Sequence, residues 1–248
     1  MLKLNELYFG DCLDIMKDID DKSIDMVLAD LPYQITANKW DIKIPLERLW
    51  PEYKRLIKPN GIIALTASQP FTSLLVMSNL EMYRHEWIWI KNRGSNFANT
   101  VREPFKEHEQ VLIFSNGNWT YNKQMQERTG SGLSRVKYDF NHVTETPNYN
   151  KFTKPSDSKG KKLRVPSSHQ KFNTEVGLHP NQKPVTLFEY LIKTYTNEND
   201  IILDNACGSG TTAIACMKTK RNYLLIEKEK KYFEISKKRI DEYKITIN

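Results

Sequence analysis

The sequence predicts an α/β protein built on a mostly parallel sheet with helices on its faces. Two short apolar runs, 26–29 and 201–203, are typical of buried strands, and each leads directly into an acidic residue and a turn. Open α/β sheets bind ligands at the carboxyl ends of their strands, so both turns are candidate binding sites. Only 35 residues follow Ala213, enough for one strand and one helix. The remaining strands must come from the N-terminal part, which predicts a permuted strand order.

The N-terminal half is expected to alternate strands and helices. A first strand over 7–9 leads to Asp11, which either caps a helix over 13–19 or contacts a ligand. A helix is expected over 71–77, and Trp87 and Trp89 are expected in the core rather than stacked on a base. Short apolar runs predict further strands over 26–29, 62–65, 87–90 and 111–114.

The C-terminal half is expected to contain three helices and two strands. The strands are expected over 201–204 and 223–226, with a helix over 213–217 between them. A helix over 183–194 should present one face with Leu187, Tyr190, Leu191 and Thr194. The last helix, 230–243, should turn Phe233, Ile240 and Tyr243 inward and its lysines outward.

The first turn is the tetrad Asp30-Leu31-Pro32-Tyr33, which places an acidic oxygen, a rigid turn and an aromatic ring together. Such a group can hold a planar ring that carries an amino group. Carboxylate and carbonyl oxygens accept from the amine, while the tyrosine stacks on the ring. An Asp-x-Pro turn after a strand is also commonplace, so the tetrad needs a second, independent signal.

The second turn supplies that signal. Gly208 and Gly210 allow a tight turn with close approach to a ligand, before a helix whose N-terminus favours a negative group. Glu227 ends the next strand nineteen residues after Gly208, where an acid usually reaches ribose hydroxyls. The pattern also satisfies the dinucleotide fingerprint, but too few strand–helix units follow it for that fold. The turn therefore indicates a nucleoside site.

The tetrad resembles the (Asp/Asn/Ser)-Pro-Pro-Tyr motif of amino-group DNA methyltransferases. With the later Gly-rich turn, in this order, the whole chain resembles the β class of N6-adenine or N4-cytosine DNA methyltransferases. The stretch 179–184, His-Pro-Asn-Gln-Lys-Pro, is a distinctive part of this resemblance, and 10–12 and 108–109 match further family elements. The resemblance implies a Rossmann-like S-adenosylmethionine-dependent methyltransferase fold, with a seven-stranded sheet and an inserted target-recognition segment.

The resemblance also implies roles for individual residues. S-adenosylmethionine is the expected cofactor, and Asp30 favours adenine N6 as the methylated amine, with Tyr33 stacked on a base flipped from the duplex. Asp30, Leu31, Pro32 and Tyr33 are the expected catalytic residues. The expected cofactor-binding residues are Asp11, Cys12, Lys183, Pro184, Asp204, Ala206, Gly208, Ser209, Gly210, Thr211, Thr212 and Glu227.

Two positions depart from the family pattern. Leu31 stands where the family usually has proline, but it keeps the backbone carbonyl, and Pro32 favours an extended Leu31. Asn205 and Ala206 stand where the cofactor turn usually has Pro-Phe, so Ala206 lacks an aromatic contact that another ring could supply. An N4-cytosine enzyme and a DNA-binding relative without turnover therefore stay open as alternatives.

The positive charge is concentrated in one segment. The chain has a net charge of +7, and 120–178 holds eleven Lys or Arg against five Asp or Glu, with interleaved aromatic residues. This composition suits contacts with phosphates and bases of double-stranded DNA, although a solvated loop is the alternative for any single lysine. We expect 120–178 to be the target-recognition segment, between a catalytic half (1–119) and a cofactor-binding half (179–248). Lys159, Lys161, Lys162 and Arg164 are the candidate DNA contacts.

Composition bounds the remaining possibilities. No apolar run approaches the ~20 residues of a membrane span, so no membrane association is expected. Three cysteines without metal-ligand spacing, none of them after a proline, indicate a reducing cytoplasm, no metal site and no C5-cytosine nucleophile. A homodimer and a cognate restriction endonuclease stay open as partners.

Overall fold

The computed structural model describes residues 2–33, 44–130, 132–133, 162–178 and 181–247. Contacts divide them into a main unit, Met1–Asn122 with Ser168–Asn248, and a second unit, Lys123–Ser167. The second unit lies within the segment expected to read the target. Its described residues include a short antiparallel ladder, β6 (Gln126–Glu127) with β7 (Leu163–Arg164), in which Gln126 pairs with Arg164.

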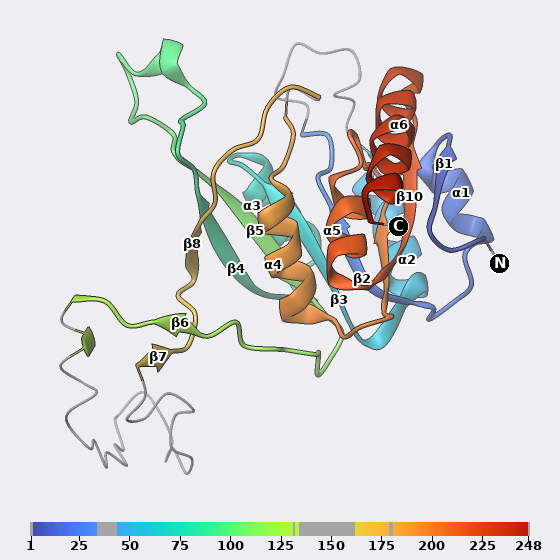
Figure 1. Ribbon diagram of the computed structural model, residues 1–248, viewed down its shortest axis with the longest axis horizontal. Coiled ribbons are helices and arrows are strands. Elements are labelled where there is room, and N and C mark those ends of the chain that lie inside the picture. The colour runs from blue at the N-terminus through green and yellow to red at the C-terminus, as the bar shows by residue number, and fades with distance from the viewer. Residues whose placement is uncertain (1, 34–43, 131, 134–161, 179–180, 248) are drawn as a thin grey trace. The chain divides into compact units, whose positions relative to one another are not determined.

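The main unit is built on an eight-stranded sheet in the order β1-β10-β9-β2-β3-β5-β4-β8 (Figure 1). Every neighbouring pair is parallel except the two that involve β5, which runs opposite to the rest. The strands are β1 (Glu6–Phe9), β2 (Ile24–Ala29), β3 (Ile57–Ala67), β4 (Tyr83–Ile90), β5 (His108–Phe114), β8 (His169–Lys171), β9 (Ile201–Asp204) and β10 (Asn222–Glu227).

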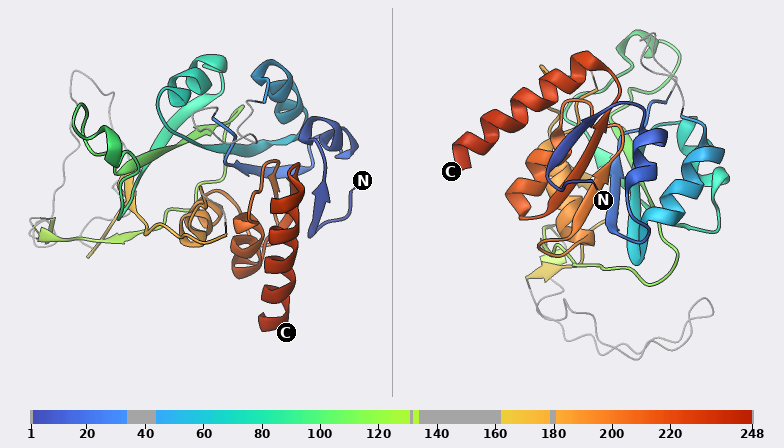
Figure 2. Two further views of the ribbon diagram at one scale, coloured as in Figure 1. Left: turned by 90° about the horizontal axis from the view of Figure 1, so that it is seen from above. Right: turned by 90° about the vertical axis from the view of Figure 1, so that its right-hand side faces the viewer.

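Helices cover both faces of this sheet (Figure 2). One face carries α1 (Cys12–Ile15), α2 (Leu46–Leu56) and α3 (Phe71–Ser78), and the other carries α4 (Val185–Tyr195), α5 (Thr211–Thr219) and α6 (Lys230–Ile247). Two short 3-10 turns, η1 (Met16–Asp18) and η2 (Phe97–Asn99), follow α1 and β4. No helix in the described part of the chain is long and apolar enough to cross a membrane.

Alternating side chains of the central strands build two separate cores. Val27 and Ala29 pack with the first group of helices, whereas Met26 and Leu28 pack with the second. This alternation follows from the two-residue period of a strand, and it explains why residues 26–29 of β2, buried on both faces, are all apolar. Trp87 and Trp89 lie in the second core, as expected from the sequence.

Four details differ from the expectations. The sheet has eight strands rather than seven, because β8, from the end of the segment 120–178, pairs with β4. The helix expected over 13–19 ends at Ile15 and continues only as the 3-10 turn η1. The helix α2 was not expected, because Pro51 lies inside it and proline normally interrupts a helix. On α6, Tyr232 rather than Phe233 is buried, together with Ser236 and Ile240.

Candidate functional site

A cavity of ≈ 360 Å³ lies at the carboxyl ends of β2 and β9, two neighbouring parallel strands of the sheet. The chain leaves β2 toward α2 on one face and leaves β9 toward α5 on the other. Such a switch point opens a crevice between the two turns, where α/β sheets bind their ligands. The tetrad and the Gly-rich turn, 174 residues apart from Asp30 to Asp204, therefore face one cavity.

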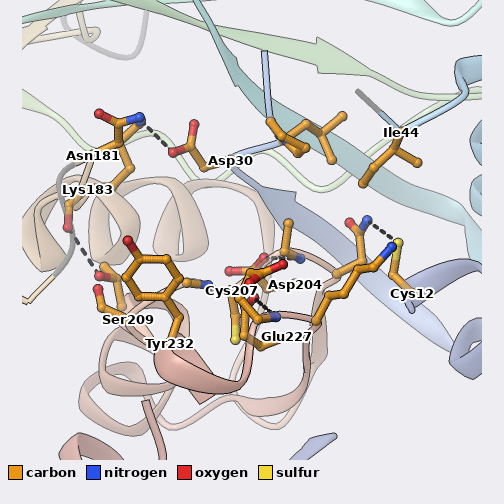
Figure 3. Close-up of a pocket in the computed structure, with 18 of the residues that line it drawn as sticks. Cys12, Asp30, Ile44, Asn181, Lys183, Asp204, Cys207, Ser209, Glu227 and Tyr232 are labelled. Carbon is orange, nitrogen blue, oxygen red and sulfur yellow. Dashed lines mark hydrogen bonds and ion pairs between the residues drawn. The ribbon is translucent and has the colours of Figure 1, made fainter. Parts of the chain in front are cut away.

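Most of the expected site residues line this cavity. The four residues of the tetrad do so, and nine of the twelve expected cofactor residues join them: Asp11, Cys12, Lys183, Asp204, Ala206, Gly208, Ser209, Thr211 and Glu227. Figure 3 shows Asp30 and Lys183 toward one end and Cys12 toward the other, with Asp204 and Glu227 between them. Pro184, Gly210 and Thr212 are not part of the lining. Thr212 donates a hydrogen bond to Asp204, and Gly210 lies against Ser236 of α6.

The carboxylate of Asp30 is held by three donors. The hydroxyls of Tyr33 (2.6 Å) and Thr66 both donate to Oδ1, and Lys183 Nζ donates to Oδ2 at 2.7 Å. Thr66 is the second-last residue of β3, which ends beside β2 because the two strands are parallel. The acid is thus fixed by neighbours from three separate parts of the chain.

Lys183 belongs to a buried row of alternating charges. Its Nζ lies 3.4 Å from Glu109 Oε2, and the other oxygen of Glu109 accepts from Lys91. Burial alone would lower the pKa of Lys183, but the carboxylates of Asp30 and Glu109 outweigh it and raise the pKa above its usual value. Burial likewise opposes ionisation of Glu109, yet the two lysines hold its pKa below the ordinary range. Lys183 and Glu109 therefore both stay charged at neutral pH.

Tyr33 has hydroxyl contacts in addition to the ring that the sequence led us to expect beside the target base. The ring stacks on Phe71, with centroids 4.9 Å apart and planes inclined by 29°, and it lines the cavity. Burial, followed by the nearby Asp30 carboxylate, raises the pKa of Tyr33 well above its usual value, so its hydroxyl stays a donor. The hydroxyl therefore has a structural task in orienting Asp30, which sequence reasoning did not assign to it.

The Gly-rich turn is closed by the acid at the end of β10. Glu227 Oε2 accepts from Gly208 N at 2.8 Å, and Oε1 accepts from Glu229 N at the same distance. Gly208 and Gly210 adopt left-handed φ angles of 54° and 75°, which L side chains rarely adopt. A Cβ on Gly210 would lie 2.3 Å from Ser236 Oγ on α6, so this position also requires glycine for close packing.

Asp204 lies beneath the turn and is nearly inaccessible. Its Oδ1 accepts from Ala206 N at 3.2 Å, and its Oδ2 accepts from the hydroxyl of Thr212 in α5. Burial raises the pKa of Asp204 to about 7, and the neighbouring carboxylates of Asp30 and Glu227 add to this effect. The side chain is therefore poised to change charge near neutral pH.

Asp11 caps a helix, which is one of the two roles that the sequence left open, and it also lines the cavity. Its Oδ1 accepts from Leu13 N at 2.9 Å and caps α1, while Oδ2 lies 3.0 Å from Lys228 Nζ at the mouth of the cavity. The adjacent Cys12 is buried, and its sulfur lies 3.5 Å from the amide nitrogen of Asn205. Asn205 accepts from the hydroxyl of Tyr53 at 2.6 Å, which ties the turn to α2.

Several site residues were not found from the sequence. Thr66 lies near the carboxyl end of β3, and Lys91 directly follows the carboxyl end of β4. The one feature that could have identified them from the sequence is this position, at the same end of the sheet as Asp30. Tyr232 lines the cavity, as does Ala206, which stands where the family pattern has an aromatic ring. Of the expected DNA contacts, Lys159 and Lys161 lie outside the described residues, and Lys162 and Arg164 belong to the second unit.

The electrostatics of the cavity favour a cationic, polar ligand. Asp30, Asp204 and Glu227 are acidic groups of the lining, of which Asp204 is only partly ionised at neutral pH, and Lys183 is already paired with Asp30 and Glu109. Apolar contacts come from Leu31, Ile44 and Phe188. A site of this size, mostly apolar with a few converging polar groups, is typical of small-molecule and cofactor binding.

Comparisons with known proteins are consistent with this geometry. Residues 24–238 match the model of a family described as DNA methylase. The chain is 28% identical to the type II methyltransferase M2.MboI of Moraxella bovis, over 95% of this chain and 87% of that protein. It is 26% identical to the DNA adenine methyltransferase YhdJ of Escherichia coli, over 94% and 81%. The crystal structure of the M1.HpyAVI–SAM complex superposes with a TM-score of 0.64 at 26% identity, covering 95% and 98%.

Proposed function

Because this chain belongs to the DNA methylase family, we propose that it transfers the methyl group of S-adenosylmethionine to the N6 amine of adenine in double-stranded DNA. It is a DNA methyltransferase, and S-adenosylmethionine is its cofactor. The observation that carries the adenine proposal is the carboxylate of Asp30. It faces the cavity beside the Gly-rich turn, oriented by two hydroxyls and an ammonium group.

The cavity residues fit this cofactor. Its sulfonium and ammonium groups are cationic, and the three acidic groups named above line the cavity. Asp11 and Glu227, near the mouth, would accept from the hydroxyl and amine groups of its adenosine part. Tyr232 and Phe188 supply apolar surface to the same cavity. When bound, S-adenosylmethionine supplies an electrophilic methyl group on a positively charged sulfur.

The tetrad acts on the amine that receives the methyl group. The lone pair of an adenine N6 amine is delocalised into the ring, so the amine is a poor nucleophile. Hydrogen bonds from the NH₂ to Asp30 and to the carbonyl of Leu31 would draw the nitrogen toward tetrahedral geometry. Because both acceptors are fixed before the base arrives, catalysis rests on positioning and electrostatics. Asp30 also provides an acceptor for the proton that the nitrogen must lose after methylation.

The choice of adenine rests on Asp30 and on one relative. The family tends to have Asp at this position for adenine, and Ser or Thr for N4-cytosine. The relative from Escherichia coli is named as an adenine methyltransferase. An N4-cytosine amine offers the same two hydrogens to the same two acceptors, so this activity is the second candidate.

Mass spectrometry of nucleosides separates the two candidates. Unmethylated DNA prepared by whole-genome amplification would be incubated with the protein and S-adenosylmethionine, digested and analysed. N6-methyladenine is the expected product. N4-methylcytosine alone would overturn the adenine assignment, and the absence of both bases would overturn the proposed activity.

A further inference from the structure

The proposed function does not explain why Lys183 forms an ion pair with Asp30. An ammonium group sits 2.7 Å from the carboxylate that should accept the target amine. The side chain of Lys183 is only 6% exposed, so water cannot solvate its charge in place of the carboxylate. Resemblance to the family suggested a role for this lysine beside the cofactor. Its contacts in the structure point to the target base instead.

The Asp30 carboxylate has a limited number of positions at which it can accept a hydrogen bond. A carboxylate offers about four lone-pair positions, two on each oxygen. Tyr33 and Thr66 occupy both positions on Oδ1 of Asp30, and Lys183 occupies one on Oδ2. One position on Oδ2 is left, and it is the one open to an incoming amine. The lysine therefore limits the geometry in which the target can bind.

Glu109 determines where Lys183 can go. Glu109 Oε2 is buried and has no hydrogen-bond donor in bonding geometry among the described residues, although Nζ lies 3.4 Å away as an ion pair. An unsatisfied buried carboxylate oxygen is costly, so it is a ready acceptor for the same ammonium. Lys91 neutralises the other oxygen of Glu109. Lys183 thus has a second anionic partner beside the one that it holds at rest.

The four charged groups meet because of the sheet topology. Asp30 and Lys91 follow the carboxyl ends of β2 and β4, and Glu109 lies at the start of the antiparallel β5. Lys183 enters just before α4. All four come to one edge of the sheet, in the order Lys91, Glu109, Lys183, Asp30, with alternating charges and no net charge.

We propose that Lys183 is a positioning residue for Asp30, and that Glu109, fixed by Lys91, positions Lys183. This inference rests on the proposed function, because Asp30 is taken to receive the target amine. Lys183 keeps the carboxylate oriented so that the remaining position on Oδ2 faces the incoming amine, and Glu109 Oε2, 3.4 Å from Nζ, holds Lys183 in that place. Glu109 does not line the cavity, so we expect it to affect the rate of methyl transfer only through Lys183.

The test separates methyl transfer from cofactor binding. Single-turnover transfer from tritiated S-adenosylmethionine to whole-genome-amplified DNA would be measured for the wild-type protein, Glu109→Gln and Glu109→Asp. Calorimetry would give the Kd of S-adenosylmethionine for each. We expect Glu109→Gln to slow transfer about tenfold or more while Kd changes less than about twofold. Glu109→Asp should recover part of the rate, because it keeps the charge.

A second comparison tests whether Glu109 acts through Lys183. Lys183→Met should slow transfer by roughly 10²-fold, the typical effect of losing one preorganised contact, and Lys183→Arg should be milder. The double variant Lys183→Met/Glu109→Gln should be no slower than Lys183→Met alone. Additive losses would overturn the proposed order of action.

Lys58→Met is the matched control. Lys58 Nζ lies 2.8 Å from both oxygens of Asp25, in a partly buried pair at the opposite edge of the sheet. Its loss should leave both the transfer rate and Kd unchanged. A normal rate in Glu109→Gln, or a loss of cofactor affinity equal to the loss of rate, would overturn the inference alone. A wild-type protein that methylates no base would overturn the proposed function and the inference together.

Discussion

The carboxylate of Asp30 shows how much of this site depends on single side chains. Three donors from Tyr33, Thr66 and Lys183 fix it, and the nearest of these in sequence is three residues away while the farthest is 153. A fixed acceptor helps catalysis because it needs no reorganisation when the reacting amine arrives. At the residue scale, function should therefore be sensitive both to Asp30 and to the groups that orient it.

Asp30→Ala should abolish most methyl transfer while cofactor binding persists, because the carboxylate acts on the target amine. Loss of a preorganised polar contact typically costs ~10²–10³ in rate. Single-turnover kinetics and calorimetry with S-adenosylmethionine would measure the two effects. Residual transfer above about a tenth of the wild-type rate would contradict the role given to Asp30.

Tyr33→Phe should also slow methyl transfer, because it removes the hydroxyl that donates to Asp30 Oδ1 at 2.6 Å. We expect a loss of about tenfold, since one neutral donor to a charged acceptor contributes roughly 1.5–3 kcal/mol and Thr66 remains. Tyr8→Phe is a matched control, as the Tyr8 hydroxyl donates to Lys3 O at an exposed site. Wild-type rates in Tyr33→Phe would show that only the ring matters.

The raised pKa of Asp204 predicts a pH dependence of stability. Burial raises the pKa to about 7, so the folded protein keeps this proton at pH values where the unfolded chain, with an ordinary pKa of 3.8, has lost it. Stability should therefore fall as pH rises from about 4 to 7, and the cost should then level off. Asp204→Asn cannot ionise, so its stability relative to the wild-type protein should increase over this window, by up to about 4 kcal/mol.

Urea denaturation of the free protein at several pH values would measure this difference. Other carboxylates titrate in the same window, so the difference between Asp204→Asn and the wild-type protein is the informative quantity. Parallel curves for the two proteins between pH 4 and 7 would show that Asp204 has an ordinary pKa.

At the scale of an element, the turn between β9 and α5 depends on the helix packed behind it. Arg239 on α6 donates to Ser209 O at 3.0 Å and to Thr211 Oγ1 at 3.1 Å, and Ser236 lies against Gly210. The turn is thus clamped between Glu227 and α6. Its glycines serve two needs, a left-handed backbone and close contact with a neighbouring helix.

Gly210→Ala should lower the free energy of unfolding by about 2 kcal/mol or more. A left-handed φ of 75° costs an L residue roughly 1–2 kcal/mol, and the new Cβ would lie 2.3 Å from Ser236 Oγ. Ser236→Ala, combined with Gly210→Ala, should recover the part due to the clash. Gly130→Ala is the control for backbone strain alone, because Gly130 has a φ of 53° and nothing within 4 Å of its missing Cβ. Equal losses in Gly210→Ala and Gly130→Ala would show that packing against α6 is unimportant.

At the scale of the whole molecule, the surplus of positive charge in 120–178 predicts how DNA binding responds to salt. Neutralising Lys159, Lys161, Lys162 and Arg164 together should weaken DNA binding. Each lost phosphate contact should lower the magnitude of the log–log salt slope by roughly 0.9. Neutralising Lys230, Lys231, Lys237 and Lys238, four exposed lysines of α6, removes the same charge elsewhere. Fluorescence anisotropy with labelled duplex DNA would measure both slopes, and equal slopes in the two variants would remove the first cluster from the interface.

The sequence alone located the strands that matter most. The carboxyl ends of β2 and β9 were predicted to the residue, because a short buried apolar run followed by an acid and a turn marks where a parallel strand stops. The start of β2 lies two residues before the predicted one, at Ile24. It also identified the tetrad and most of the cavity lining, since glycine, proline and acidic residues have strong local meaning. The sequence did not predict α2, because Pro51 lies inside this amphipathic helix and proline normally argues against one. It also assigned the wrong inward residue to α6, where Tyr232 rather than Phe233 is buried.

Local pattern thus determined the fold class, the order of the two halves, and the residues that could bind and react. Tertiary structure decided which of them touch. It paired Asp30 with Lys183, linked Lys183 to Glu109 and Glu109 to Lys91, directed the Tyr33 hydroxyl to Asp30, and brought Tyr232 into the lining of the cavity. The physical reason is that these contacts follow from strand order and from the direction of β5, which join residues far apart in the chain. Spacing along a sequence carries no information about partners that only the assembled sheet brings together.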